Sequence, residues 1–480
     1  MQKYPSVASL KTHEQFQSRL SELGLSLQAD KELDAGPESP LGQPMATRAG
    51  TVGNRFAILP MEGWDGTTEG QPTELTLRRW ENFGASGAKL IWGGEAVAIR
   101  PDGRANPNQL MLDSPSKSDS IKKLNETLRE SHRKAFGNED GLVVGLQLTH
   151  SGRFARPNRK DTLEPKVAYR HSLLDKRSGG QPIELMTDED LQDLIQRFIV
   201  AAKCAEDSGF QFVDVKHCHG YLGHELLSGF DREGKYGGSF ENRTRFLREI
   251  VEGIRGQTGI QVGVRLSMFD FAPYSPGDNA RIGVSEGGPD YRDAFGPGTN
   301  SDDIDFEEPF KFMELLRELE IDLICTTAGS PYYNPHIQRP AAFPPSDGYF
   351  PPEDPLVGVD RQITATAKLK AAFSDINFVG SGYSYLQDWL PHVGQRCVRE
   401  GQVDSIGLGR MVLSYPELPA DVLGDEQMKR KKICRTFSDC TTAPRNGMIS
   451  GCFPLDPFYK VMPERKQLIQ LKKQFTEGKS

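Results

Sequence analysis

Eight short apolar runs recur along the chain, and this rhythm is the feature that most limits its fold. Most intervals between the runs carry amphipathic helical patterns, such as residues 188–209 before the fourth run and 240–259 before the fifth. A strand followed by a helix, repeated eight times, is the sequence form of a (β/α)8 TIM barrel, which we predict. The runs are residues 56–60, 89–94, 141–148, 210–216, 260–266, 321–327, 376–382 and 405–410.

Alternation within three of these runs predicts which side chains face the inside of the barrel. Residues 141–148, 210–216 and 260–266 each have one aliphatic face, which should pack on the outer helices. The opposite face would then direct Gln147, Lys216 and Arg265 inward at the carboxyl ends of their strands. Because barrels of this kind carry their chemistry at that end, we expect a functional site there.

The rhythm also decides the domain organisation. At roughly 150 residues per domain, 480 residues would suggest three domains, but the strand and helix signals run on without a break. We therefore predict one barrel over residues 53–425, an N-terminal helical arm over 1–52 and a C-terminal extension over 426–480.

Two further patterns lie outside the strands. Thr12 and Gln15 have capping-box spacing, followed by Phe16, Leu20 and Leu23 on one face of a short helix. Three connections that follow strands are too long for simple turns, and we expect them to form walls over the barrel mouth that govern substrate choice. They are residues 149–186, 268–310 and 328–358.

The charge balance limits the class of partner. The chain has 58 basic and 66 acidic residues, a net charge of −8, which gives no general attraction to nucleic acids or anionic membranes. No apolar run approaches the ~20 residues of a membrane-spanning helix, and the N-terminus has no apolar signal region. Seven scattered cysteines suggest a reducing compartment, so we expect a cytoplasmic protein that binds a small molecule. A homo-oligomer is left open.

Six segments of the chain carry motifs of one known family: NRFAILPM (54–61), LQLTHSGR (146–153), HGYLGHELLSGF (219–230), YGGSFENRTRF (236–246), VGVRLS (262–267) and IGLGR (406–410). They resemble the motifs of the old yellow enzyme family of flavin-dependent oxidoreductases. They occur in the order of that family, and YGGSFENRTRF matches over eleven consecutive residues. The resemblance implies one FMN across the barrel mouth, reduced by NADH or NADPH as electron donor.

The resemblance also implies how FMN is held. A glutamine and an arginine matching Gln147 and Arg265 would bind the pyrimidine edge of the flavin, where negative charge accumulates on reduction. Glycines after the last two strands would let backbone N–H groups approach the phosphate. Neither the glycines at 380 and 382 nor those at 407 and 409 complete the motif G-x-G-x-x-G, so a dinucleotide-binding Rossmann domain is not supported. The expected FMN-binding residues are Pro60, Met61, Glu62, Ala96, Gln147, Arg265, Gly382, Tyr383, Gly409 and Arg410.

The expected catalytic residues are Lys216, His219 and Tyr221. In the family, the first and fourth residues of the matching motif grip the substrate's carbonyl or nitro oxygen while hydride reaches the β-carbon. A tyrosine at the position of Tyr221 then protonates the α-carbon. His217 and His224 are interpreted as ordinary loop or helix-start histidines.

Two positions depart from the family pattern. Lys216 stands where a histidine is usual, which either favours an anionic substrate or lets the lysine pair with an acid such as Asp214. Glu62 stands where threonine or cysteine is usual. If ionised, its carboxylate would lower the flavin's reduction potential, and if protonated it would donate a hydrogen bond.

Cys434, Cys440 and Cys452 resemble an iron–sulfur segment of the longer family branch, which includes dienoyl-CoA reductase and trimethylamine dehydrogenase. That segment has four cysteines, whereas Phe437 takes the place of the second one here. A [4Fe–4S] cluster normally uses four thiolates. We therefore expect a degenerate segment without a metal or iron–sulfur cluster, and no extra domains of that branch.

The function expected from these features is NAD(P)H-driven, FMN-dependent reduction of the C=C bond of an α,β-unsaturated carbonyl or related compound, anionic compounds included. One alternative is the oxidation or oxidative N-demethylation of an amine, which occurs in the longer branch. A different class of function is a non-catalytic barrel that keeps FMN as a sensor or structural ligand.

Overall fold

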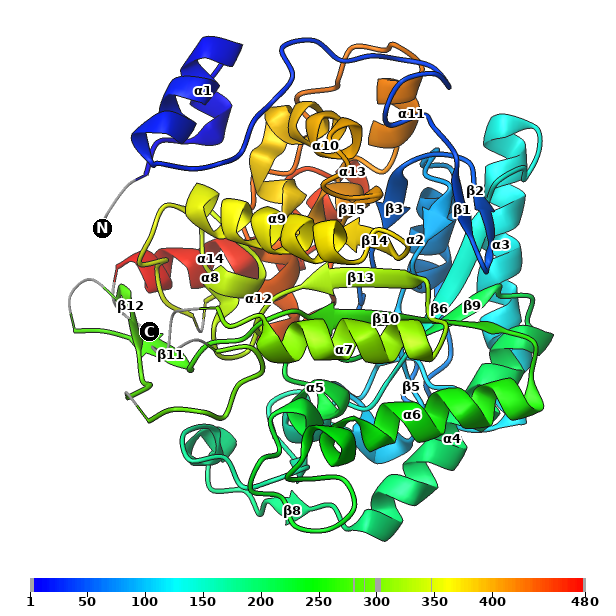
Figure 1. Ribbon diagram of the computed structural model, residues 1–480. Coiled ribbons are helices and arrows are strands. Elements are labelled where there is room, and N and C mark those ends of the chain that lie inside the picture. The colour runs from blue at the N-terminus through cyan, green and yellow to red at the C-terminus, as the bar shows by residue number, and fades with distance from the viewer. Residues whose placement is uncertain (1–3, 279–280, 289, 298–303, 347, 478–480) are drawn as a thin grey trace.

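The chain forms a closed barrel of eight parallel strands, as the computed structural model shows (Figure 1). The structure describes residues 4–278, 281–288, 290–297, 304–346 and 348–477. Pairing of β4 with β6 and of β15 with β3 closes the ring, which confirms the predicted TIM barrel. Its strands are β3 (Phe56–Ile58), β4 (Leu90–Ile91), β6 (Val143–Thr149), β9 (Phe212–Val215), β10 (Gln261–Ser267), β13 (Leu323–Thr327), β14 (Asn377–Gly380) and β15 (Ser405–Leu408).

A helix follows each barrel strand and packs outside the ring. Helix α4 illustrates why these segments are helical, since Thr187 and Asp190 form a capping box and the apolar face that includes Leu191 and Leu194 is buried. The outer helices are α2 (Glu74–Gly84), α3 (Ser118–Phe136), α4 (Asp188–Asp207), α6 (Phe240–Gln257), α7 (Glu307–Glu318), α9 (Pro355–Ala372), α10 (Leu390–Arg399) and α11 (Leu418–Leu423).

The interior of the barrel confirms the predicted facing of the strands. Val143, Phe212 and Leu323 belong to a cluster inside the ring, whereas the alternating aliphatic residues of the same strands join the larger core shared with the helices. Phe212 fills the space beside Gly145, where a Cβ atom would lie only 2.2 Å from the phenylalanine ring. The apolar layers leave the polar inward positions to the mouth.

The N-terminal arm packs against the barrel. Helix α1 (His13–Glu22) begins with the predicted capping box of Thr12 and Gln15. Its Phe16 ring stacks on Trp389 with a centroid distance of 5.0 Å. The hairpin β1 (Met45–Thr47) and β2 (Gly50–Val52) then contributes side chains to the cluster inside the ring. The division of the chain at residues 52/53 and 425/426 stays a prediction.

Loops at the mouth carry short elements. After β6 come η4 (Gly152–Phe154), β7 (Lys166–Val167), η5 (Leu174–Ser178) and β8 (Glu184–Leu185), and after β10 come β11 (Tyr274–Pro276) and β12 (Gly283–Ser285). Helix α8 (Pro335–Gln338) follows β13. Within the predicted loops 268–310 and 328–358, residues 279–280, 289, 298–303 and 347 lie outside the described residues.

The C-terminal extension lies beside the loop that follows β13 (Figure 1). It contains α12 (Asp439–Arg445), α13 (Pro457–Lys460) and α14 (Glu464–Thr476). The Phe475 ring lies 5.7 Å from Phe343 and 5.3 Å from Phe350, measured between ring centroids. The remaining short elements are η1 (Val7–Ser9), β5 (Ala96–Ala98), η2 (Pro101–Gly103), η3 (Pro115–Lys117), α5 (Leu222–Leu227), η6 (Tyr383–Trp389) and η7 (Arg410–Leu413).

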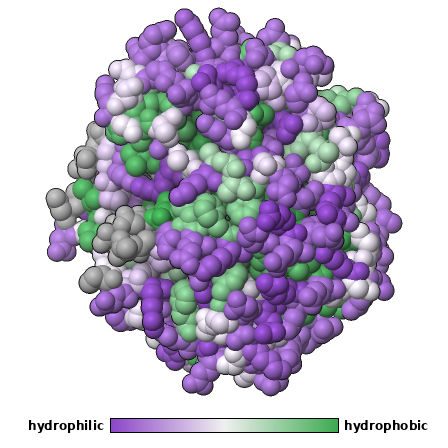
Figure 2. All heavy atoms as spheres, in the orientation of Figure 1, coloured by the Kyte–Doolittle hydropathy of each residue, from purple (hydrophilic) through white to green (hydrophobic). Residues whose placement is uncertain are grey.

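The surface agrees with the composition. The face seen in Figure 2 is mainly hydrophilic, and its hydrophobic residues form small groups. In the part of the chain that the structure describes, no helix is both long enough and apolar enough to cross a bilayer.

Candidate active site

A cavity of about 380 Å³ opens at the carboxyl ends of the barrel strands. All but two of the predicted site residues line it, although they come from five different strands and the loop after β9. The parallel sheet brings them together because every strand ends at the same rim. The lining residues among those predicted are Pro60, Met61, Glu62, Gln147, Lys216, His219, Tyr221, Arg265, Gly382, Gly409 and Arg410.

Ala96 and Tyr383 are the two predicted residues that do not line the cavity. Ala96 is buried on β5, and its carbonyl oxygen accepts a hydrogen bond from Gln109 Nε2 at 2.8 Å. The Tyr383 ring is buried close to Gly380, beneath the strand end. Their roles in binding FMN stay predictions.

The floor of the site is organised by Asp214, which is fully buried inside the barrel. Its carboxylate accepts hydrogen bonds from Trp92 Nε1 at 2.7 Å, Gln147 Nε2 at 2.6 Å and the backbone N–H of Arg265 at 2.7 Å. These three donors fix the side chain of Gln147 and the strand that carries Arg265. Among the described residues no close ion pair joins Asp214 to Lys216, whereas the buried carboxyl group of Glu62 interacts electrostatically with the lysine. The pairing of Lys216 with an acid stays a prediction, with Glu62 rather than Asp214 as the candidate partner.

Two buried arginines present unsatisfied donors at the site. Arg265 Nε and Arg410 Nη1 are buried without a hydrogen-bond partner among the described residues, while Arg410 Nη2 donates to the Pro340 carbonyl at 2.8 Å. An unsatisfied buried guanidinium N–H is costly, so each position favours an anionic or carbonyl-rich ligand. Gly382 follows β14 with a φ of 97°, a backbone conformation that favours glycine. The chain turns there and so places its backbone at the cavity, which Arg410 also lines.

Lys216, His219 and Tyr221 meet on one wall because the chain turns sharply after β9. His219 has a φ of 67° and Gly220 a φ of 75°, and these two residues reverse the chain. Lys216 Nζ lies 3.9 Å from the centroid of the Tyr221 ring, a cation–π contact. Gln338 Nε2 lies 3.1 Å from His219 Nε2. The three side chains thus form one polar wall.

The burial of this wall sets its protonation states. Burial, together with the nearby cations Arg265 and Lys216, holds the pKa of His219 well below its usual value, so the imidazole is neutral at neutral pH. Burial raises the pKa of Tyr221 well above 10, so its phenol keeps its proton. Burial likewise lowers the pKa of the Lys216 ammonium. The wall therefore offers a neutral imidazole and a protonated phenol.

Glu62 faces the same wall from the end of β3. Burial raises the pKa of its carboxyl group, and the neighbouring Lys216 opposes that shift. The direction favours the protonated form, in which the carboxyl group donates a hydrogen bond.

His217 and His224 support the turn rather than the cavity. His217 Nδ1 lies 2.9 Å from the Val215 carbonyl oxygen, and His224 Nδ1 accepts a hydrogen bond from the Gly220 backbone at 2.9 Å. Neither histidine lines the cavity. Their side chains hold the segment that presents His219 and Tyr221.

Sequence reasoning missed most of the cavity walls. Tyr332, from the loop after β13, places its hydroxyl 2.8 Å from that of Tyr221 and stacks on Phe154 at a centroid distance of 4.2 Å. Residues 440–450 of the C-terminal extension also contribute, although the sequence suggested only a packed tail. No described residue of the predicted wall 268–310 lines the cavity. The only sequence signal for these walls was the length of the loops after the strands, and loop length does not identify individual residues.

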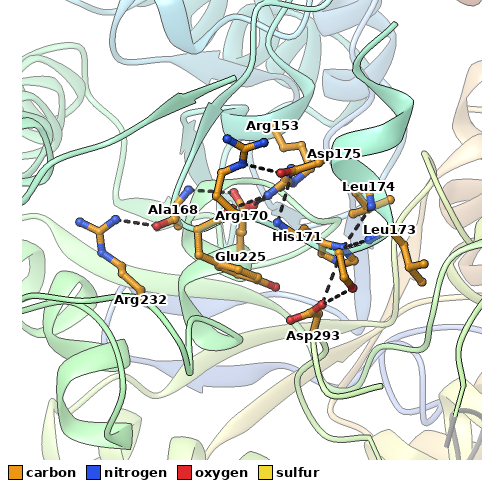
Figure 3. Close-up of polar contacts among 12 residues, drawn as sticks. Arg153, Ala168, Arg170, His171, Leu173, Leu174, Asp175, Glu225, Arg232 and Asp293 are labelled. Atoms are coloured by element: carbon orange, nitrogen blue, oxygen red, sulfur yellow. Dashed lines mark hydrogen bonds and ion pairs between the residues drawn. The ribbon is translucent and has the colours of Figure 1, made fainter. Parts of the chain in front are cut away.

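A buried ionic network anchors the loop that follows β6 (Figure 3). Arg153 Nε donates to Glu225 Oε1 on α5 at 2.8 Å, and Arg153 also pairs with Asp175, which in turn accepts from Arg170 at 2.5 Å. Burial lowers the pKa of His171 to about 3, so its Nδ1 accepts hydrogen bonds from the next backbone N–H groups at 3.1 Å. The loop is thereby fixed to the barrel.

The three C-terminal cysteines line a second, much smaller cavity of about 20 Å³. Cys434, Cys440 and Cys452 surround it together with Phe437, and Cys440 and Arg410 border both cavities. Among the described residues, no group of three or more histidine, cysteine or acidic side chains has a metal-binding arrangement. The thiols thus gather around one space, with a phenylalanine among them.

The geometry agrees with known proteins. Residues 40–278 match the model of the NADH:flavin oxidoreductase / NADH oxidase family. An NADPH dehydrogenase of Geobacillus sp. (strain WCH70) is 29% identical over 245 residues, which cover 49% of this chain and 65%, just under two thirds, of that protein.

Solved structures with low sequence identity share the fold. A 2-naphthoyl-CoA reductase in complex with 2-naphthoyl-CoA superposes with a TM-score of 0.65 and 21% identity, covering 89% of this chain and 58% of the other. Morphinone reductase in complex with tetrahydroNAD gives a TM-score of 0.57 and 16% identity, covering 82% of this chain and 92% of the other. The sequence match adds what the fold alone does not show: residues 40–278, just under half of the chain, are similar to the NADH:flavin oxidoreductase / NADH oxidase family.

Proposed function

We propose that the protein is an FMN-dependent oxidoreductase that takes electrons from NADPH or NADH and reduces the C=C bond of an α,β-unsaturated carbonyl compound. The observation that carries this proposal is the meeting of Arg265 and Gln147 with Lys216, His219 and Tyr221 in one cavity at the barrel mouth. The first two suit a flavin ring, and the other three suit an enone oxygen and its protonation.

The cavity residues fit FMN. Arg265, whose buried Nε lacks a partner among the described residues, would hold the negative charge that a flavin ring gains on reduction. The turns at Gly382 and Gly409, with Arg410, would hold the phosphate. When bound there, FMN supplies hydride transfer between a nicotinamide and an electron-poor carbon.

Lys216 and His219 would bind the carbonyl oxygen of the substrate. Both line the cavity, and both can donate a hydrogen bond to an oxygen on which negative charge develops. The three hydrogen bonds that the Asp214 carboxylate accepts hold the strand ends beneath Lys216 and His219 in place. A preorganised donor pair of this kind stabilises charge without rearrangement during the reaction.

Tyr221 would deliver the proton to the α-carbon. Its raised pKa keeps the phenol protonated until the transfer, and Lys216 at 3.9 Å from the ring would stabilise the phenolate that results. The Tyr332 hydroxyl, 2.8 Å away, can return a proton to it. Tyr332 therefore acts through Tyr221 rather than on the substrate.

Charge argues against the amine alternative. Glu62 is the one carboxyl group among the described residues that line the cavity, and burial raises its pKa toward the neutral form. A methylated amine is a cation at neutral pH and would meet a strongly basic wall. The observed lining thus favours an electron-poor carbonyl compound.

The test is an anaerobic titration of the protein with bound FMN. We expect NADPH or NADH to bleach the flavin absorbance and a simple enone to restore it. Bleaching by a methylated amine, with no recovery on adding enone, would overturn the proposal. A Tyr221→Phe variant tests the non-catalytic alternative, because an enzyme should lose enone reduction while flavin reduction by NADPH persists.

The compartment belongs to the same proposal. All seven cysteines are free, and six of them are buried. Free thiols suit a reducing setting such as the cytoplasm. Fusion of a fluorescent protein to either end of the chain, followed by microscopy, would show whether the protein is found there.

A further inference from the structure

The cavity is far more basic than the chain as a whole. Among the described residues, eight lysine and arginine side chains line it against one carboxyl group, that of Glu62, although the complete sequence has a net charge of −8. Such an excess concentrates positive potential in a cleft with low-dielectric walls. We therefore expect the molecules that bind in the cavity to carry negative charge.

Part of this positive charge is accounted for. On the function proposed above, Arg265 and Arg410 serve the flavin ring and its phosphate. Arg177 Nη2 forms an ion pair with Glu286 Oε2 at 2.9 Å. Lys216 lies beside Glu62 and the substrate oxygen site. Arg339 donates to Thr441 Oγ1 and Arg445 donates to the Pro331 carbonyl, so both side chains join a mouth loop to the C-terminal extension. The cations Arg156 and Lys160, both on the loop after β6, are left without such a role.

Arg156 and Lys160 stand on the rim of the cavity without counter-ions. Neither forms an ion pair with any residue that the structure describes, and Lys160 Nζ instead donates to the Gly447 carbonyl oxygen at 3.1 Å. Both side chains are only partly exposed, and burial lowers the pKa of Lys160. Partly desolvated cations without an anionic partner are stabilised when an anion binds between them.

The position of the rim relative to the chemistry is set by Tyr332. Its hydroxyl contacts Tyr221, while the Arg156 guanidinium carbon lies 6.0 Å from the centroid of its ring. Tyr332 therefore spans from the proton donor to the rim. A substrate lying along this ring would place its double bond near Tyr221 and its far end near Arg156.

Arg156 and Lys160 also stay in place. The Arg153 network fixes the start of their loop to α5, and the hydrogen bond from Lys160 ties the loop to the C-terminal extension. Arg445 of α12 donates to the Pro331 carbonyl and so joins the extension to the loop of Tyr332. Three chain segments thus build one rim.

We propose that Arg156 and Lys160 form a subsite for a carboxylate or phosphate carried by the unsaturated substrate, at the end remote from its C=C bond. The substrate class is therefore an anionic conjugated carbonyl compound with a flat spacer about the width of one aromatic ring. This inference rests on the proposed enone reduction.

The test compares two substrates that differ in one charge. We suggest para-carboxybenzalacetone and its methyl ester, reacted anaerobically with protein whose FMN has been reduced by dithionite, so that NADPH is not needed. The variants are Arg156→Gln, Lys160→Gln and the double variant. Arg159→Gln is the matched control, because Arg159 lies on the same loop, pairs with Asp161 at 2.9 Å and does not line the cavity.

We expect the wild-type protein to reduce the carboxylate about tenfold faster than the ester at low substrate concentration. The double variant should lose this preference by slowing on the carboxylate alone, and each single variant should lose part of it. Arg159→Gln should keep it. FMN content and circular dichroism should be unchanged in all of them, which shows that folding is preserved.

Two results would overturn the inference. One is equal reduction of carboxylate and ester by the wild-type protein. The other is a double variant that weakens only NADPH binding in the reductive half-reaction, which would assign the rim to the phosphates of the nucleotide. If neither compound reoxidises the wild-type flavin, the proposed function itself fails, so the two failures are distinguishable.

Discussion

Two cavities share Arg410 and Cys440 as lining residues, and they differ in the parts of the chain that form their walls. The large one, about 380 Å³, is built from side chains at the ends of barrel strands, whose positions the ring dictates. The small one, about 20 Å³, is built from the C-terminal extension around three thiols and Phe437. Strand ends bring a complete set of polar groups together, whereas the tail gathers a set that is one thiol short of a four-cysteine site.

The largest effect should come from Arg265, on which the large cavity's ligand would depend. Arg265→Leu removes charge-assisted hydrogen bonds worth about 1.5–3 kcal/mol each, so we expect FMN affinity to fall by about a hundredfold. Flavin absorbance per chain after gel filtration measures this. Arg159→Leu, a surface change, should purify with full FMN, and a fully loaded Arg265→Leu protein would contradict the cofactor assignment.

Tyr221→Phe should leave FMN bound and slow the chemistry. Loss of a general acid costs about 10²–10⁴-fold, so enone-dependent reoxidation of the flavin should slow by that factor while reduction by NADPH changes little. Stopped-flow absorbance separates the two half-reactions. Equal slowing of both would show that Tyr221 acts on binding or folding rather than on protonation.

The same tyrosine predicts a pH dependence. Because burial raises the Tyr221 pKa well above 10, the phenol keeps its proton throughout the neutral and mildly alkaline range. The reoxidation rate should therefore not fall between about pH 7 and pH 9, since the proton would be lost only above the raised pKa. A decline centred in that window would assign the proton donation to another group.

Tyr332→Phe should have a smaller effect than Tyr221→Phe. It removes the hydroxyl 2.8 Å from the Tyr221 phenol but keeps the ring that stacks on Phe154. We expect reoxidation to slow by several-fold, with an altered solvent isotope effect, because proton return to Tyr221 is impaired. An unchanged isotope effect would show that Tyr332 contributes only through packing and takes no part in proton return.

A substitution at the small cavity should have the smallest effect on FMN binding and activity. Cys452→Ala should leave FMN content and enone reduction unchanged, since Cys452 lines only the small cavity and no metal would be lost with the thiol. Iron and zinc analysis of the native protein, purified without oxygen, should find far less than one metal per chain. One iron–sulfur cluster per chain would overturn the comparison between the cavities.

Much of the barrel could be predicted because its signals are periodic. Alternation of two along the strands placed Gln147, Lys216 and Arg265 at the mouth, and the capping box placed α1. The walls could not be predicted in the same way. Tyr332 reaches the cavity from the loop after β13 and Arg445 from the last residue of α12, and their contacts depend on side chains distant in sequence rather than on any repeat.

Strand ends also show the limit of motif matching. Tyr383 follows β14 beside Gly382, yet only the glycine lines the cavity, because the tyrosine ring packs beneath Gly380. Asp214 shows the reverse case. The sequence offers it as an ion-pair partner of Lys216, but three donors inside the barrel already satisfy its carboxylate.

The central claim is that the large cavity is an FMN site, and titration of flavin-free protein with FMN tests it most directly. We expect quenching of FMN fluorescence that saturates at one FMN per chain, and a weakening of about a hundredfold in Arg265→Leu. The absence of saturable binding, or equal affinity in the wild-type and Arg265→Leu proteins, would contradict the account.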